Sequence, residues 1–208
     1  MIFGISGIKF SDFNKGQIST SEELNIVRLV ILGGPGAGKG TQAKLLCSYL
    51  GIPCLDIGQI LRQKIRAQTE LGRQAKPFVE QGELVPDEIM IQFVRQQLLD
   101  PDVAKGWLLD GYPRTAFQAE ELDFLLEDLD QRLNWVIYLN VPEKVLKNRS
   151  LERSRADDQL GIIERRIELF YQRTIPILEY YEPRGHLLDV NGEQPPEQIY
   201  QEICQRLK

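Results

Sequence analysis

The chain has 208 residues, of which 42% are hydrophobic and 26% are charged, and its formal net charge is −5. These values predict one globular domain with a core of its own, and the acidic balance argues against a nucleic-acid-binding protein. No apolar run approaches the roughly 18 residues of a membrane span. Three cysteines without C-x-x-C spacing predict neither a disulfide framework nor a zinc ribbon. We therefore expect a cytoplasmic protein with reduced thiols.

Residues 1–25 do not read as a secretory signal, because no basic segment precedes their apolar start and polar residues follow it. We interpret this segment as a flexible N-terminal tail. The folded domain is expected at 26–208.

Apolar runs and helical patterns alternate along this domain. Strands are expected at 26–32, 52–55, 107–109, 135–141 and 187–190. Helices are expected at 41–50, 58–67, 71–81, 86–99, 115–129, 142–153, 157–181 (kinked at Pro176) and 196–207. This order predicts an α/β fold, a doubly wound parallel sheet of about five strands with helices on both faces.

The sequence GGPGAGKGT at 33–41 follows the first expected strand and precedes a helix, as a phosphate-binding loop (P-loop) requires. Glycines let backbone N–H groups and a helix N-terminus surround phosphate oxygens, and Lys39 adds a full positive charge. Thr41 offers a hydroxyl for Mg²⁺, although the general pattern places Ser or Thr at the position of Gly40. Asp110 ends an apolar strand and is a second candidate for the Mg²⁺ shell.

No N-K-x-D guanine-binding motif follows the loop, which disfavours a GTPase. Four segments instead resemble the adenylate kinase family: GGPGAGKGTQA (33–43), GELVPDEI (82–89), GWLLDGYPRTAFQAE (106–120), and RADDQ with ERR (155–159, 164–166). The resemblance implies a P-loop nucleoside monophosphate kinase domain at 26–208. Its core would be 26–55, 86–148 and 159–208, with a small helical monophosphate-binding insert at 56–85 and a very short lid at 149–158.

Many family members carry a longer lid, sometimes with four zinc-binding cysteines. This lid is short and has no cysteine, so no structural zinc is expected. Short-lid relatives are usually monomers, and the resemblance therefore implies a monomer.

The resemblance also assigns site residues. ATP would be bound by Gly34, Pro35, Gly36, Ala37, Gly38, Lys39, Gly40, Thr41, Arg149, Arg153 and Gln194. AMP would be bound by Ile57, Arg62, Glu83, Leu84, Val85, Gly111, Tyr112, Arg114, Gln118, Arg155 and Arg166. Mg²⁺ would arrive with ATP and be held by Thr41 and Asp110, mostly through waters. The implied catalytic residues are Lys39, Arg114, Arg155 and Arg166.

The chemistry agrees with a site built from cations. The acceptor is already an anionic phosphate and needs no general base, so transfer depends on positioning and charge neutralisation. The single histidine, His186, is accordingly expected to be structural. Arg165 and Arg173 are expected on the surface. A competing interpretation treats 149–166 as a solvated helix face, with glutamates paired to its arginines.

Base specificity rests on few residues. Thr115 and Gln118 match AMP-specific members of the family, whereas uridylate and cytidylate kinases have P-R-N there. Ile57 replaces a threonine that touches adenine. Gln59 replaces an aspartate associated with the Mg²⁺ water shell, and Asp56 is a candidate to compensate.

Three hypotheses follow. The first is an adenylate kinase, and the second is a kinase for UMP, CMP or another monophosphate. The third is a nucleotide-binding regulatory module of low activity that works through its N-terminal tail. The expected partners are the small molecules ATP and AMP, with no nucleic acid and no membrane.

Overall fold

The computed structural model describes residues 26–153 and 159–207. The expected tail at 1–25 lies outside this range, as do residues 154–158 of the expected lid. The described strands form one parallel sheet of order β2-β3-β1-β4-β5. They are β1 (Val27–Leu32), β2 (Cys54–Asp56), β3 (Gly106–Asp110), β4 (Trp135–Asn140) and β5 (Leu187–Asn191). The expected α/β fold is confirmed.

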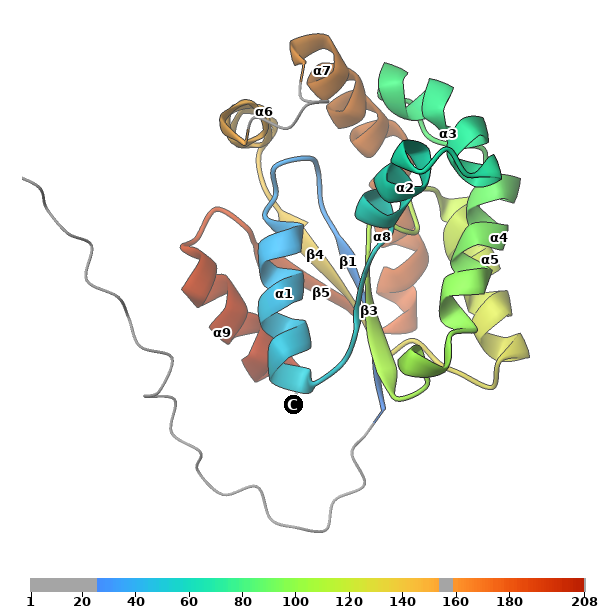
Figure 1. Ribbon diagram of the computed structural model, residues 1–208. Helices are drawn as coiled ribbons and strands as arrows, with labels where there is room; N and C mark the ends of the chain where they lie inside the picture. The colour runs from blue at the N-terminus through green and yellow to red at the C-terminus, as the bar shows by residue number, and fades with distance from the viewer. Residues whose placement is uncertain (1–25, 154–158, 208) are drawn as a thin grey trace, which may run out of the picture.

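Helices cover both faces of this sheet. The α-helices are α1 (Lys39–Leu50), α2 (Ile57–Arg66), α3 (Glu70–Gln81), α4 (Asp87–Leu98), α5 (Ala116–Asp128), α6 (Glu143–Glu152), α7 (Leu160–Leu169), α8 (Pro176–Tyr181) and α9 (Pro196–Arg206). Shorter helical turns are η2 (Pro101–Val103), η3 (Phe170–Thr174) and η4 (Glu182–Arg184). In Figure 1, α1 and α9 lie on one side of the sheet, and α4, α5 and α8 lie on the other.

The core lies where these two helical layers meet the central strands. Leu29, Val30 and Ile31 of β1 have no exposed surface, and every residue of β3 is buried. A parallel sheet covered on both faces buries both sides of its strands, which explains their continuous apolar runs. Trp107 of β3 is fully buried and is the largest side chain in this core.

The strands end at a common edge of the sheet, and this edge positions the site. The P-loop follows β1, while β2 ends at Asp56 and β3 at Asp110. These two aspartates are register partners. In open α/β sheets, ligands bind outside the carboxyl ends of the strands. The fold therefore places the glycine loop and both carboxylates around one location.

Helices α2 and α3 form a compact pair between β2 and α4. The Asp56 carboxylate caps α2 by accepting the N–H of Gln59 at 2.7 Å, and Thr69 caps α3 by accepting the N–H of Gly72 at 3.1 Å. A Cβ on Gly72 would lie 2.1 Å from the carbonyl oxygen of Lys64. Only glycine therefore lets the two helices approach this closely.

The long helix expected at 157–181 is divided in the structure. A π turn, η3, separates α7 from α8, and the N–H of Ile175 donates to the carbonyl of Phe170 at 3.0 Å. Pro176 has no N–H to donate and begins α8. The proline therefore accompanies a change of helical hydrogen bonding, where the sequence had predicted only a kink.

Candidate nucleotide-binding site

A cavity of about 740 Å³ opens at the carboxyl edge of the sheet. This volume falls within the usual range for small-molecule sites. The P-loop, α2, the segment before α4, the β3–α5 connection and the α7–η3 helix contribute to its walls. The cavity therefore joins segments that lie far apart in the sequence.

The P-loop forms one wall of the cavity and packs tightly against α6. A Cβ on Gly36 (φ 81°) would lie 2.5 Å from the carbonyl oxygen of Leu146, so a side chain is excluded there. Gly38 adopts φ 96° and precedes α1, where a left-handed backbone favours glycine. These constraints bend the loop so that α1 begins at Lys39, directly at the cavity.

Lys39 folds back over the loop that carries it. Its Nζ donates to the carbonyl oxygens of Gly33 at 2.7 Å and Gly34 at 3.0 Å. Burial lowers the pKa of Lys39 to about 8; the charge of Asp110 opposes this shift, whereas Arg114 and Arg153 add to it. A cation held in such an enclosed place is suited to binding phosphate oxygens.

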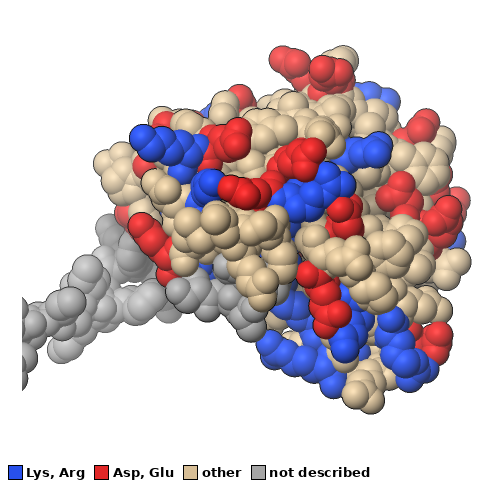
Figure 2. Space-filling view, turned by 90° about the horizontal axis from the view of Figure 1, so that it is seen from above, with Lys and Arg blue, Asp and Glu red and all other residues tan. Residues whose placement is uncertain are grey.

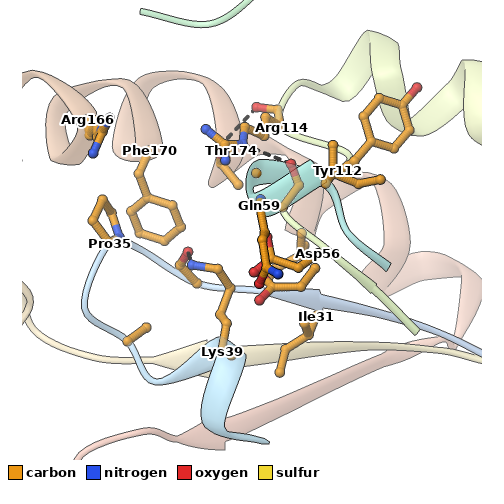
Figure 3. A pocket seen from close by; sticks show the side chains of 18 of the residues that line it. Ile31, Pro35, Lys39, Asp56, Gln59, Tyr112, Arg114, Arg166, Phe170 and Thr174 are labelled. Atoms are coloured by element: carbon orange, nitrogen blue, oxygen red, sulfur yellow. Dashed lines mark hydrogen bonds between the residues drawn. The ribbon is translucent and has the colours of Figure 1, made fainter. Parts of the chain in front are cut away.

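Arginines reach the same cavity from other elements. Arg62 comes from α2, Arg114 from the β3–α5 connection and Arg166 from α7, and all three line the cavity. Enclosure by the cavity walls lowers the pKa of Arg114, and the charges of Arg166 and Arg62 lower it further. Figure 3 shows Lys39 approaching from the P-loop side and Arg114 and Arg166 from the opposite side.

The backbone and side chain of Arg114 are held in place. Its Nε donates to the carbonyl of Gly111 at 2.9 Å, and its backbone N–H donates to Gln118 Oε1 at 2.8 Å. Its carbonyl accepts the hydroxyl of Thr174 at 3.0 Å, which ties the β3–α5 connection to the end of η3 (Figure 3). The guanidinium is thus pre-positioned toward the cavity.

Gln118 lies in the wall of the cavity and is 2% exposed. Besides accepting from Arg114, its amide donates to Asp87 Oδ1 at 2.6 Å. An amide has two donor hydrogens and two acceptor lone pairs, so one of each stays available to a ligand. Ile57, the first residue of α2, is buried in the same wall. Buried Tyr112 completes this side and donates its hydroxyl to the carbonyl of Gln118 at 3.3 Å.

Two carboxylates lie among these cations. Asp110 is 7% exposed, and the charges of both Asp110 and Asp56 act on Lys39 and Arg114. Within the described residues, no group of three or more His, Cys, Asp or Glu could hold a metal ion. Mg²⁺ usually takes one or two carboxylates and completes its shell with phosphates and waters. Asp110, with the exposed Thr41 of α1 also lining the cavity, fits that kind of site.

The residues of the short lid are only partly described. Arg149 and Arg153 line the cavity, and Arg149 Nη1 donates to the carbonyl of Gly192 at 2.8 Å. Gln194 is not part of the cavity wall: its amide donates to the carbonyl of Asn191 at 3.2 Å and to Glu202 at 2.9 Å. Arg155 lies outside the described residues.

The segment before α4 reaches the cavity with Gly82, Glu83, Leu84 and Val85. The Glu83 carboxylate, however, binds Arg165 of α7, with Nε–Oε1 at 2.5 Å and Nη2–Oε2 at 3.1 Å. Arg165 was expected to be a plain surface residue, yet it joins two walls of the site. Arg173 is exposed, as expected.

The helix after the lid contributes residues that the sequence analysis missed. Leu169, Phe170 and Thr174 line the cavity with Arg166, and Met90 of α4 lines it as well. Phe170 follows Arg166 by four residues, about one helical turn, and this spacing could have indicated that both side chains lie on the same face of the helix. His186 is exposed, and its Nδ1 lies 3.0 Å from the carbonyl oxygen of Asn134.

The surface seen from above the cavity mixes both charges (Figure 2). Ion pairs on α6 and α7 include Lys147 with Glu164 at 2.5 Å and Arg165 with Glu168 at 2.7 Å. The competing interpretation of 149–166 as a solvated helix face therefore holds for Glu164 and Arg165, which form ion pairs. It does not hold for Arg149, Arg153 and Arg166, which face the cavity.

The glycine loop between β1 and α1, together with the cation-lined cavity, defines a P-loop nucleotide-binding protein. Residues 31–186 match the family model described as Adenylate kinase. A relative named Adenylate kinase 2 from Nostoc sp. is 58% identical over 181 residues, covering 87% of this chain and 98% of the relative. Another of that name, from Synechocystis sp., is 50% identical over 87% of this chain and 100% of the relative. The chain therefore belongs to the adenylate kinase family of nucleoside monophosphate kinases.

Proposed function

We propose that this protein transfers a phosphoryl group reversibly from ATP to AMP, giving two ADP, with Mg²⁺ bound to the nucleotide. One observation carries the proposal: Lys39, Arg62, Arg114 and Arg166 come from four different segments and line one cavity. A site that binds a single nucleotide does not need four cationic side chains from four segments in one cavity. Two facing polyphosphates bring a large negative charge together, and transfer between them needs that charge neutralised.

Each cation has a role that follows from its place. The P-loop N–H groups and Lys39 would hold the ATP phosphates, with Arg149 and Arg153 on the lid side. Arg62 and Arg114 would hold the phosphate of AMP, because they line the cavity from α2 and from the β3–α5 connection and not from the P-loop. Arg166 would grip the transferring phosphoryl together with Arg155, which stays a prediction from the sequence.

Mg²⁺ would be held on the nucleotide by Asp110 and Thr41, partly through waters. When bound, it adds positive charge that stabilises the phosphoryl oxygens during transfer. Asp56 is a register partner of Asp110, but its Oδ1 already accepts the N–H of Gln59. Its carboxylate keeps further acceptor sites, so Asp56 is a candidate to replace the carboxylate missing at Gln59.

Gln118 supports adenine as the acceptor base, since its amide keeps one donor and one acceptor for a ligand. Ile57 supplies apolar contact in the same wall but no hydroxyl. Because Ile57 stands where the family has a threonine that touches adenine, UMP and CMP are retained as alternative acceptors. We further propose that α2 and α3, within 56–85, act as the monophosphate-binding insert.

The test is an assay of nucleoside diphosphate formation from ATP, Mg²⁺ and each of AMP, UMP, CMP and GMP. We expect turnover with AMP and at most a small fraction of it with the others. A preference for UMP or CMP would show that Ile57 decides the base. Binding of ATP without turnover of any acceptor would reject the kinase in favour of a regulatory binding module. The Arg114→Gln variant serves as the inactive control.

The protein is proposed to act as a monomer in the cytoplasm. Over the described ranges, 26–153 and 159–207, no helix has the length and apolar character needed to cross a membrane. Analytical ultracentrifugation with and without nucleotide measures the oligomeric state directly.

A further inference from the structure

The helix that carries Arg166 changes its hydrogen bonding where it passes the cavity. In η3 the N–H of Ile175 donates to the carbonyl of Phe170, five residues earlier, at 3.0 Å. Single π turns of this kind inside helices are found frequently at functional sites. Phe170 and Thr174, the first and last residues of η3, both line the cavity. The geometry of the π turn therefore acts directly on the wall of the site.

The π turn keeps Thr174 on the same side of the helix as Arg166. Arg166, Phe170 and Thr174 follow each other at intervals of four residues, and all three line the cavity. In a regular α-helix, four residues turn through about 400°, so a second interval of four would leave Thr174 about 80° away from Arg166. A π turn holds one more residue in each hydrogen-bonded turn than an α-helix, which takes up this drift.

Thr174 uses this position to hold the β3–α5 connection. Its side chain is largely buried, at 8% exposure for the residue, and its hydroxyl donates to the carbonyl of Arg114 at 3.0 Å (Figure 3). Arg114 lies between the end of β3 at Asp110 and the start of α5 at Ala116. Its carbonyl therefore takes part in neither the sheet nor the helix, and the Thr174 hydroxyl fixes it from another part of the chain.

We propose that Thr174 is a positioning residue for phosphoryl transfer, whose hydroxyl sets the separation of Arg114 and Arg166 by tying the β3–α5 connection to the helix of Arg166. The inference rests on the proposed function, in which both guanidinium groups act on phosphates. Two such cations repel each other until anionic substrates arrive. A bond between the elements that carry them keeps both charges in place beforehand, as preorganised stabilisation of a transition state requires.

The position of Thr174 predicts which kinetic constant depends on it. The phosphates of ATP are proposed to bind at the P-loop, which precedes α1 and belongs to neither of the two tied segments. Loosening the bond should therefore leave the KM for ATP within twofold of wild type. Transfer depends on the relative placement of two arginines and is sensitive to small displacements of such groups. The effect should appear in kcat.

The first test replaces the hydroxyl by a methyl group of similar size. Thr174→Val should lower kcat about tenfold, as expected for the loss of one neutral hydrogen bond. Thr174→Ser keeps the donor and should recover at least half of the wild-type kcat. An unchanged kcat in Thr174→Val, or equal losses in the valine and serine variants, would overturn the proposal.

Tyr180→Phe is the matched control for the loss of a hydroxyl between two helical segments. The Tyr180 hydroxyl donates to Asp123 Oδ2 at 2.9 Å and joins α8 to α5, and neither residue lines the cavity. This variant should have a lower melting temperature and a kcat within twofold of wild type. A tenfold fall in its kcat would show that any weakened helix contact slows the reaction, which would remove the special role of Thr174.

A double-mutant cycle shows whether Thr174 acts through Arg114. In an Arg114→Gln background the guanidinium that Thr174 is proposed to position is absent. Thr174→Val should then change the residual kcat by less than twofold, because residues that act as a unit are not additive. A further tenfold fall in that background would mean that Thr174 acts apart from Arg114 and would contradict the proposal.

Hydrogen exchange of the backbone measures the tie without reference to activity. Amides of 111–118 should exchange faster in Thr174→Val than in wild type, and Thr174→Ser and Tyr180→Phe should match wild type there. Unchanged exchange in Thr174→Val would show that the hydroxyl does not hold the connection. If wild type had no kinase activity, the proposed function would fail, while the exchange measurement would still decide whether Thr174 positions Arg114.

Discussion

Arg165 and Glu83 form a two-point ion pair that joins α7 to the segment entering α4, with Nε–Oε1 at 2.5 Å and Nη2–Oε2 at 3.1 Å. Glu83 lines the cavity, and Arg166, which follows Arg165 in the sequence, points into it. Neighbouring Gly82 also packs against α7, since a Cβ there would lie 3.1 Å from Ile162. The pair therefore sets the distance between the acceptor wall and a proposed catalytic arginine.

Glu83→Gln should raise the KM for AMP about threefold, the size expected for one partly exposed ion pair, with kcat within twofold of wild type. Glu168→Gln is the matched control, because Glu168 binds the same Arg165 at 2.7 Å but lies on α7 itself. Steady-state kinetics at two salt concentrations measure both. Equal effects of the two variants would assign the pair to general helix stability.

Lys39→Met should show that Lys39 serves phosphate binding at the expense of protein stability. The pKa of Lys39 is 10.5 in the unfolded chain and about 8 in the folded protein. Between these values the unfolded state binds more protons, so this residue makes the protein more stable as the pH rises from 8 to 10.5. Below pH 8 the Lys39 ammonium is charged in both states, and its burial lowers the stability of the folded protein by the full amount.

Thermal melts at pH 7 and pH 10 test this sign. The stability of wild type relative to Lys39→Met should increase between the two pH values, by on the order of 2 kcal/mol. Kinase activity should fall by about 10²-fold or more, because a preorganised charge is lost. A wild-type advantage that shrank toward pH 10 would mean that the pKa of Lys39 is not lowered by burial.

Arg114→Gln and Arg166→Gln should each lower kcat by about 10²–10³-fold. Thermal stability should be kept within a few degrees, since both side chains face the cavity and not the core. Arg173→Gln, an exposed position outside the cavity wall, is the control. Loss of AMP binding with unchanged kcat would reassign the arginines from the transferring phosphoryl to ground-state binding.

Gln118→Leu should affect both specificity and stability. The change leaves the Arg114 N–H and the Asp87 carboxylate without a partner, which costs about 1–3 kcal/mol of unfolding free energy. AMP should also lose its advantage over UMP, because the base-facing amide is gone. Gln118→Glu keeps an acceptor for Arg114 but sets a second carboxylate against Asp87, so it tests loss of the donor together with charge repulsion. Unchanged AMP selectivity in both variants would exclude Gln118 from base recognition.

The sequence alone determined the α/β class, the P-loop and the family. These follow from local signals: short apolar runs, glycines where backbone N–H groups must converge, and the segment from Asp110 to Gln118. It also pointed to Arg114 and Arg166 from motifs that surround them. Most of these residues prove to share one cavity.

Tertiary packing alone decided which charges face a ligand and which pair with each other. Arg165 and Arg166 are adjacent in sequence, yet one binds Glu83 and the other enters the cavity, because successive helix positions point about 100° apart. These contacts join segments that are distant in the sequence or separated by a turn. Composition and sequence spacing do not determine the distance between such segments in the folded protein.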